Sequence, residues 1–283
     1  MRLLQFTDFH LQLSPVPPEQ FHVQPFWRGD LREVFARLGR AAVHADAIAF
    51  TGDAAHGGGK AEVAMFFDLL AGAASGKPVF MVLGNHDVID SHWEEHFHRG
   101  AERYRNVRME DGVYRLGEID IAIINNEYLT PDDVPSPSWD ESHFPIPAFS
   151  AARAARLQNA LSAAPDRPAV ALMHCPSHVL PPTMLDLGRS VMEGMDRYRQ
   201  ALHALLDANP RVGLVLSGHV HFTSTRSFNH GRVHQSLASI SEYPYQVRLV
   251  EMNAARWSSR LFSLAEDRES EVTGNFAAAQ VAG

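Results

Sequence analysis

The chain has 283 residues, 45% of them hydrophobic, and a formal net charge of −8 at pH 7. The content of apolar residues is ample for a large core, and the negative charge argues against a surface built to hold nucleic acid. Apolar stretches remain shorter than the roughly 20 residues that span a bilayer. We expect a cytoplasmic protein, because Asp8 interrupts the N-terminus before a signal peptide could form and the single cysteine, Cys175, fits a reducing compartment.

The first part of the chain predicts alternating strands and helices. Short apolar runs at 3–6, 47–51 and 79–83 read as buried strands. Between them, one helix is expected from about Asp30 and a second from about Lys60. Their apolar positions follow the helical period: Leu31, Val34, Phe35 and Leu38 in the first, and Val63, Phe66, Phe67 and Leu70 in the second. This βαβαβ order predicts a parallel sheet with helices on its faces.

The remainder predicts further helices and strands and a short tail. Helices are expected at 91–104, 150–163 and 190–208, and strands at 113–116, 119–125, 169–173 and 212–216. After His221 the period changes to two, which predicts strands at 223–228, 233–237, 245–251 and 259–262 in a second sheet of antiparallel hairpins. We expect one domain over 1–263 and a tail over 264–283 that is disordered or an oligomer arm.

Two proline-rich segments are too long to be simple connectors. The segment 11–29 reads as a loop beside the functional site, and the segment 130–147 as a lid, a substrate wall or an oligomer contact. Differences in substrate choice are expected in these two loops.

Five apolar runs are each followed by side chains that bind metal ions. Ligands of open α/β sheets lie outside the carboxyl ends of the strands, so this pattern predicts one site built by five loops. The mixture of carboxylate, amide and imidazole groups suits a two-metal centre, whereas structural zinc favours thiolates. The candidate ligands are Asp8, His10, Asp53, Asn85, His174, His219 and His221.

Local spacing supports the convergence of these ligands. If the segment after the first strand is extended, Asp8 and His10 point to the same side of it. His219 and His221 have the same two-residue spacing. Glycines at 52 and 84 precede two other ligands, which lets the backbone turn sharply there.

In order along the chain, these motifs resemble those of the calcineurin-like metallophosphoesterase superfamily. The resemblance rests on Asp8-x-His10, Gly52-Asp53, Gly84-Asn85-His86-Asp87, His174 and Gly218-His219-x-His221. The layout is most similar to bacterial cyclic-nucleotide and glycerophosphodiester phosphodiesterases. It implies an α/β fold, a four-layer α/β/β/α sandwich with two mixed sheets flanked by helices.

The resemblance also implies roles for individual residues. One divalent ion would be held by Asp8, His10 and His221, the other by Asn85, His174 and His219, with Asp53 bridging both. His86 matches no ligand position and is expected to be the general acid that protonates the leaving oxygen. Mixed nitrogen and oxygen ligands suit Mn²⁺, Fe, Zn²⁺ or Co²⁺, and the sequence does not choose among them.

The expected activity is hydrolysis of a phosphodiester by a metal-bound hydroxide, on a cyclic nucleotide or a glycerophosphodiester. A phosphomonoesterase or a nucleotide pyrophosphatase remains open, because the same metals serve these reactions. A nuclease would need basic side chains leading to the site, and a metal-free scaffold would have lost ligands that are all present here. The expected partner is a small phosphate ester, with no membrane and no nucleic acid, and a homodimer is left open.

Some positions depart from the family pattern. His56 stands where several branches carry an aspartate that supports the catalytic histidine, so either Asp87 orients His86 or His56 faces the substrate. Cys175 is read as a small buried residue, and His178 as either loop surface or pocket. Asn85, His56 and His178 are therefore the candidate substrate contacts.

Overall fold

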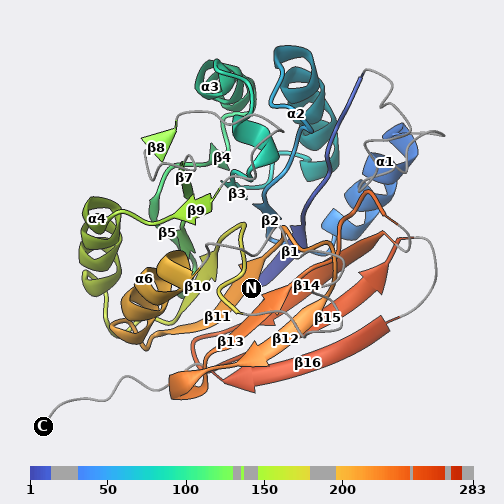
Figure 1. Cartoon of the computed structure of the whole chain (residues 1–283). Helices are drawn as coiled ribbons and strands as arrows, with labels where there is room; N and C mark the ends of the chain where they lie inside the picture. The colour runs from blue at the N-terminus through green and yellow to red at the C-terminus, as the bar shows by residue number, and fades with distance from the viewer. Residues whose placement is uncertain are drawn as a thin grey trace, which may run out of the picture.

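Two β-sheets lie face to face between two layers of helices (Figure 1). The structure is a computed structural model. It describes residues 1–13, 31–129, 135–136, 146–178, 196–242, 245–264 and 269–275. The arrangement confirms the four-layer α/β/β/α sandwich expected from the sequence.

The first sheet has seven strands in the order β16-β15-β14-β1-β2-β3-β4. Strands β1 to β4 run parallel, as the βαβαβ pattern predicts, whereas β14 pairs antiparallel with β1 and extends the sheet with β15 and β16. Their bounds are β1 Arg2–Phe6, β2 Ala47–Thr51, β3 Val79–Val82, β4 Val107–Arg108, β14 Gln246–Met252, β15 Arg256–Ser263 and β16 Glu269–Asn275.

The second sheet has six strands in the order β12-β13-β11-β10-β6-β5. Strands β6, β10, β11 and β13 are parallel neighbours, and β5 and β12 close the two edges antiparallel. The bounds are β5 Gly112–Leu116, β6 Ile119–Ile123, β10 Ala169–Leu172, β11 Val212–Ser217, β12 Ser224–Ser227 and β13 Val233–Ser236. A small third sheet joins β7 Glu127–Leu129 with β8 Pro135–Ser136 and β9 Ile146–Ala148.

Helices cover the outer faces of both sheets (Figure 1). Helices α1 Leu31–Ala42, α2 Lys60–Ala74 and α3 Trp93–Arg103 pack on the first sheet, and α4 Ala151–Ser162 and α6 Asp196–Asp207 on the second. Short 3₁₀ turns occur at η2 His86–Val88 and η3 Asn229–Gly231. None of the helices in the described ranges is long and apolar enough to cross a membrane.

Alternation along the strands divides the core into three layers. In β1 and β2, Leu4 and Phe50 pack toward the helices, while Leu3 and Ala49 pack toward the second sheet. This follows from the two-residue period of a strand. The predicted apolar stripe of α2 is buried, namely Val63, Phe66, Phe67 and Leu70.

The predicted second sheet of C-terminal hairpins is wrong. Strands β12 and β13 form a hairpin, but β13 joins β11 in parallel, and β14 and β15 join the first sheet beside β1. Strand β16 extends this sheet within a segment for which no strand was predicted. A two-residue period fixes which face of a strand is buried but does not fix its neighbour.

Several predicted features lie outside the described residues. These are the loop 14–29, the Asp30 helix cap, most of 130–147, the helix start at 190–195 and the tail residues 265–268 and 276–283. The division into 1–263 and 264–283 stays a prediction.

Candidate metal centre

The five ligand-bearing strand ends come from both sheets. Strands β1, β2 and β3 belong to the first sheet, whereas β10 and β11 belong to the second. Because the two sheets lie face to face, their carboxyl ends meet at one edge of the sandwich. The centre is therefore assembled across the interface of the two sheets rather than along one sheet.

The ligand pairs converge through left-handed backbone rather than through an extended strand. Strand β1 ends at Phe6, and Asp8 and His10 have φ angles of 53° and 49°. His219 and His221 repeat this geometry at 71° and 54°. The extended segment expected from the sequence is thus wrong, although the same-side placement of each pair holds. Positive φ is uncommon for residues other than glycine, and it recurs here at the ligands.

Glycines before the ligands leave space that a side chain would fill. A Cβ atom at Gly84 would lie 2.0 Å from Oδ1 of Asp53. A Cβ atom at Gly218 would lie 2.0 Å from Oγ1 of Thr7. Gly52 has a φ of +104° and faces the His174 ring. Close approach of the strand ends therefore requires glycine at these positions.

One group of ligand atoms gathers around His10 and His221. Their Nε2 atoms lie 3.0 Å apart. Oδ1 of Asp8 lies 3.5 Å from Nε2 of His221 and 3.9 Å from Nε2 of His10. Donor atoms about 2.0–2.2 Å from a shared ion are about 3–3.5 Å from one another, so this group fits one divalent cation.

A second group gathers around Asn85. Its Oδ1 atom lies 3.0 Å from Nε2 of His174 and 2.9 Å from Nδ1 of His219. The two imidazole nitrogens are 3.3 Å apart. One amide oxygen and two imidazole nitrogens thus face one point, which fits a second cation.

Asp53 lies between the two groups. Its Oδ2 atom is 3.4 Å from Nε2 of His10 and 3.3 Å from Nε2 of His174. The carboxylate is buried, as are the ligands Asp8 and His10. The structure therefore brings all seven predicted ligand side chains together, with Asp53 at the centre.

The charges of the centre act strongly on the imidazoles. Burial lowers the pKa of His221, but its hydrogen bonds to Asp8 and Glu242 outweigh burial and raise the pKa to about 10. Burial and the neighbouring His174 lower the pKa of His219 to about 3. Burial also lowers the pKa of His174, but the Asp53 carboxylate outweighs burial and raises it to about 9, whereas burial holds the pKa of His10 well below its usual value. Each ligand group therefore contains one imidazole with a raised pKa and one with a lowered pKa.

The ligands are oriented by hydrogen bonds from their other polar atoms. Nδ1 of His221 lies 2.6 Å from Oε1 of Glu242, and Nδ1 of His174 donates to the Thr51 carbonyl at 2.8 Å. A carboxylate or carbonyl behind a metal-binding histidine fixes its tautomer and ring orientation. Glu242 was not predicted from the sequence, because it belongs to no ligand motif and lies 21 residues after His221.

Asp87 organises the loops around the ligands. Its carboxylate accepts hydrogen bonds from the backbone N–H groups of Asp53, Ala55 and Gly84 at 2.9–3.0 Å. Burial, followed by the Asp53 carboxylate, raises the pKa of Asp87 to about 7. Asp87 therefore links the segment that follows β2 to the segment that follows β3.

His86 is held beside the centre from two sides. Its backbone N–H donates to Oδ1 of Asp53 at 2.9 Å, and its ring Nδ1 donates to the His56 carbonyl at 2.9 Å. The His56 ring stacks on the His86 ring at 4.7 Å, and the His10 ring is 4.6 Å away. The ring of His86 is thus oriented by a backbone carbonyl, while the hydrogen bonds given above for the Asp87 carboxylate come from backbone N–H groups. A contact of His56 with substrate stays a prediction.

Two nearby residues are buried. Cys175 is fully buried, as expected for a small packing residue, and burial raises the pKa of its thiol well above the usual value. His178 is also buried, and its Nε2 lies 2.9 Å from Oγ of Ser224. His178 is therefore not loop surface.

The family model of the calcineurin-like phosphoesterases matches residues 1–222, which include every ligand of this centre. The chain belongs to this family. Membership makes it a metal-dependent phosphoester hydrolase acting on small phosphate esters, and the family is typically dinuclear. A comparison with curated proteins found no match.

Solved structures share the fold at low sequence identity. A dimetal phosphatase from Danio rerio is 12% identical with a TM-score of 0.69, over 97% of this chain and 98% of the other. The protein TT1561 of Thermus thermophilus is 16% identical with a TM-score of 0.59, over 97% and 98%. A purple acid phosphatase from yellow lupin (Lupinus luteus) seeds is 12% identical with a TM-score of 0.64, over 96% and 53%.

Proposed function

We propose that the chain is a dinuclear phosphodiesterase that acts on a cyclic nucleotide or a glycerophosphodiester. The observation that carries this proposal is the position of Asp53, whose Oδ2 lies within 3.4 Å of one imidazole from each ligand group. One ion would be held by Asp8, His10 and His221, the other by Asn85, His174 and His219. Two ions supply a water of lowered pKa and positive charge for the phosphoryl oxygens.

We propose His86 as the general acid. Its Nδ1–H is committed to the His56 carbonyl, so Nε2 is the nitrogen that would deliver a proton to the leaving oxygen. The backbone bond to Asp53 keeps the ring beside the bridging carboxylate. The stacked His56 ring would limit rotation of the His86 ring, which gives His56 a positioning role in addition to its expected contact with substrate.

The charge of the centre suits an anionic phosphate ester. The contacts described for the ligand atoms come from histidine, carboxylate, amide, hydroxyl and backbone groups. A diester carries one negative charge near neutral pH, whereas a monoester carries close to two and is bound more strongly by a site of higher positive charge. A neutral amide at Asn85 keeps the site positive enough for an anion once two ions are bound.

Residues and loops around the metal centre are proposed to bind and select the substrate. Asn85 and His178 are proposed substrate contacts, and the loops 11–29 and 130–147 are proposed to choose the substrate. We also propose a cytoplasmic protein, with a homodimer as one arrangement.

Metal content tests the assignment of ligands without any turnover. We expect two ions per chain by plasma mass spectrometry after loading with Mn²⁺. His10→Asn and His174→Asn should each lower the content toward one ion, and Asp53→Asn should weaken both sites. His44→Asn is the matched control, because His44 is exposed and precedes strand β2, whereas Asp53 follows the carboxyl end of that strand. Equal metal content in all four variants would contradict the assignment.

A hydrolysis panel with added Mn²⁺ tests the substrate class. It compares bis-p-nitrophenyl phosphate with the monoester, and then cyclic AMP with glycerophosphodiesters. We expect faster turnover of the diester. Faster turnover of the monoester overturns the diesterase proposal, and inactivity toward every substrate with two ions bound points to a pyrophosphate or lipid-linked substrate.

A further inference from the structure

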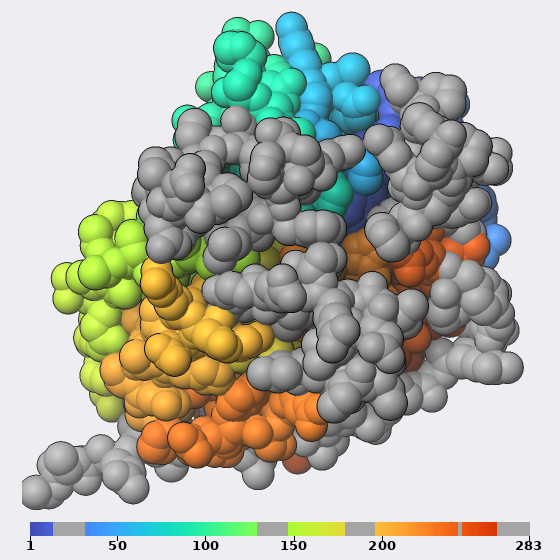
Figure 2. All heavy atoms as spheres, in the orientation of Figure 1, coloured from blue at the N-terminus to red at the C-terminus, as the bar shows by residue number. Residues whose placement is uncertain are grey.

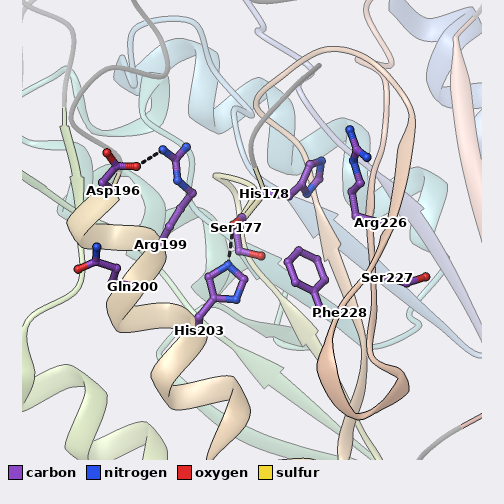
Figure 3. Close-up of a pocket in the computed structure, with 9 residues that line it drawn as sticks. All are labelled: Ser177, His178, Asp196, Arg199, Gln200, His203, Arg226, Ser227 and Phe228. Atoms are coloured by element: carbon purple, nitrogen blue, oxygen red, sulfur yellow. Dashed lines mark hydrogen bonds and ion pairs between the residues drawn. The ribbon is translucent and has the colours of Figure 1, made fainter. Parts of the chain in front are cut away.

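A cavity is lined in part by Ser177 and His178, which follow the proposed ligand His174 in the chain. It has a volume of about 420 Å³ and opens between helix α6 and strand β12 (Figure 3). Figure 2 shows α6 and the β12–β13 hairpin side by side on one face of the molecule. We call it the α6–β12 pocket; the residues used below are Ser177, His178, Arg199, His203, Arg226 and Phe228.

The same loops that carry metal ligands form this pocket. Ser177 and His178 follow His174 in the segment after β10. His178 binds Ser224, at the start of the strand that follows His221. The pocket and the proposed metal centre thus share the segments that follow β10 and β11, which is the basis for linking them below.

Two arginines give the pocket its charge. Arg199 and Arg226 stand on opposite sides of the opening with His178 between them (Figure 3). One acidic side chain of the lining, Asp196, pairs with Nη2 of Arg199 and is 85% exposed. The Nη1 atom of the same guanidinium is buried and has no hydrogen-bond partner among the described residues. A buried guanidinium nitrogen without a partner is costly, and an anion would satisfy it.

His178 provides a second polar atom that lacks a partner. The residue is 5% exposed, and its buried Nδ1 forms no hydrogen bond within the described part of the chain. Its other nitrogen begins a chain of bonds, because Nε2 contacts Ser224, Ser224 contacts Ser236, and Ser236 donates to the Phe222 carbonyl. Each hydroxyl has one proton, so the hydroxyl at 224 must accept from Nε2–H. Nδ1 of the neutral imidazole is then an acceptor.

The remaining wall is formed by His203 and the aromatic ring of Phe228. Nε2 of His203 donates to the Ser177 carbonyl at 2.9 Å, and its ring lies 5.0 Å from the ring of Phe228. The pocket therefore combines two cationic groups, an acceptor nitrogen and an aromatic wall. This set matches an anionic group that carries a neighbouring hydroxyl.

We propose that the α6–β12 pocket binds the far, non-reacting end of the substrate through a carboxylate or phosphate held by Arg199 and Arg226 and a hydroxyl held by His178. The inference rests on the proposed phosphodiesterase activity for its link to substrate. The binding of an anion in the pocket does not depend on that activity.

Equilibrium binding tests the pocket directly. D-glycerate, which carries a carboxylate beside a hydroxyl, is titrated by calorimetry into the full, metal-loaded chain. We expect Arg226→Gln and Arg199→Gln each to raise the dissociation constant about tenfold or more, because each removes a charged hydrogen bond, and Arg226→Lys to retain part of the affinity. Arg256→Gln is the matched control, because Arg256 is also an exposed arginine of a strand.

Three outcomes distinguish anion binding in the pocket, the assignment of the pocket to substrate, and the proposed hydrolytic activity. Affinity for glycerate that is equal in Arg226→Gln and Arg256→Gln overturns the pocket, because any binding then belongs to the metals. Glycerate that raises kcat on bis-p-nitrophenyl phosphate overturns the assignment to substrate and identifies a separate effector site; inhibition or no effect on kcat supports it. If no diester is hydrolysed, the proposed function fails, and the binding arm still decides on the pocket.

Discussion

The carboxylate of Glu242 lies 2.6 Å from Nδ1 of His221. The other ring nitrogen of His221 faces Asp8 and His10, so the imidazole stands between a carboxylate outside the centre and the ligand group inside it. This arrangement fixes the tautomer that presents Nε2 to a cation.

Glu242→Gln is expected to lower metal affinity about 10–100-fold, because the amide supports the ring with less negative charge. Competition with a fluorescent chelator measures the affinity of the more weakly bound ion. Glu251→Gln serves as the control, since Glu251 pairs with Arg260 in β14 and β15, away from these ligands. Unchanged affinity in Glu242→Gln would show that the contact is only structural.

Gly84→Ala is expected to disrupt the metal centre, because its Cβ would lie 2.0 Å from Oδ1 of Asp53. We expect loss of at least one of the two ions by plasma mass spectrometry. Gly72→Ala is the matched variant, because that glycine is an exposed position of helix α2 with no atom within 4 Å of the added carbon. It should keep both ions and gain about 0.5–1 kcal/mol of stability. Full metal content in Gly84→Ala would contradict the prediction.

His86→Ala is expected to act through the leaving group. Turnover of an alkyl phosphodiester should fall about 10²–10⁴-fold, because the alkoxide needs a proton as it departs. Turnover of a p-nitrophenyl ester should fall much less, because its leaving group is stable without one. Metal content should not change, since the backbone N–H at 86 keeps its bond to Asp53. An equal loss on both esters with two ions bound would remove His86 from the role of general acid.

Acid is expected to destabilise the protein through His178. Burial lowers the pKa of His178 to about 4, with Arg226, Arg199 and His203 adding to the shift. In the unfolded chain the value is about 6.5. The unfolded state therefore binds the proton more readily, and the stability due to neutral His178 is fully present above pH 6.5 and is lost as the pH falls toward 4.

Between pH 7 and pH 5 this single group should contribute a loss of about 2 kcal/mol. Urea unfolding at both values measures it in wild type and in His178→Asn. The variant should show a shallower dependence on pH, whereas His44→Asn, at an exposed site, should follow the wild type. Parallel curves for wild type and His178→Asn would contradict the pKa shift. The ligand histidines titrate in all three proteins, and their effect cancels in the comparison.

Much of the centre was predictable because its ligands follow apolar runs. A buried strand leaves a clear pattern in the sequence, and the polar residue after Phe6, Thr51 or Leu172 must lie near the end of that strand. The buried stripe of α2 was predictable for a similar reason, since the helical period records which face is covered.

Tertiary structure alone decided how these parts combine. Periodicity does not encode the neighbour of a strand, so the sequence did not place β14 and β15 beside β1. It also left open the left-handed backbone at Asp8 and His10, which depends on packing of the strand ends. Glu242 and the α6–β12 pocket join residues that are distant along the chain. The order of residues thus determined which chemical groups gather at the centre, and the folded chain determined their orientation, because orientation depends on contacts that no local pattern records.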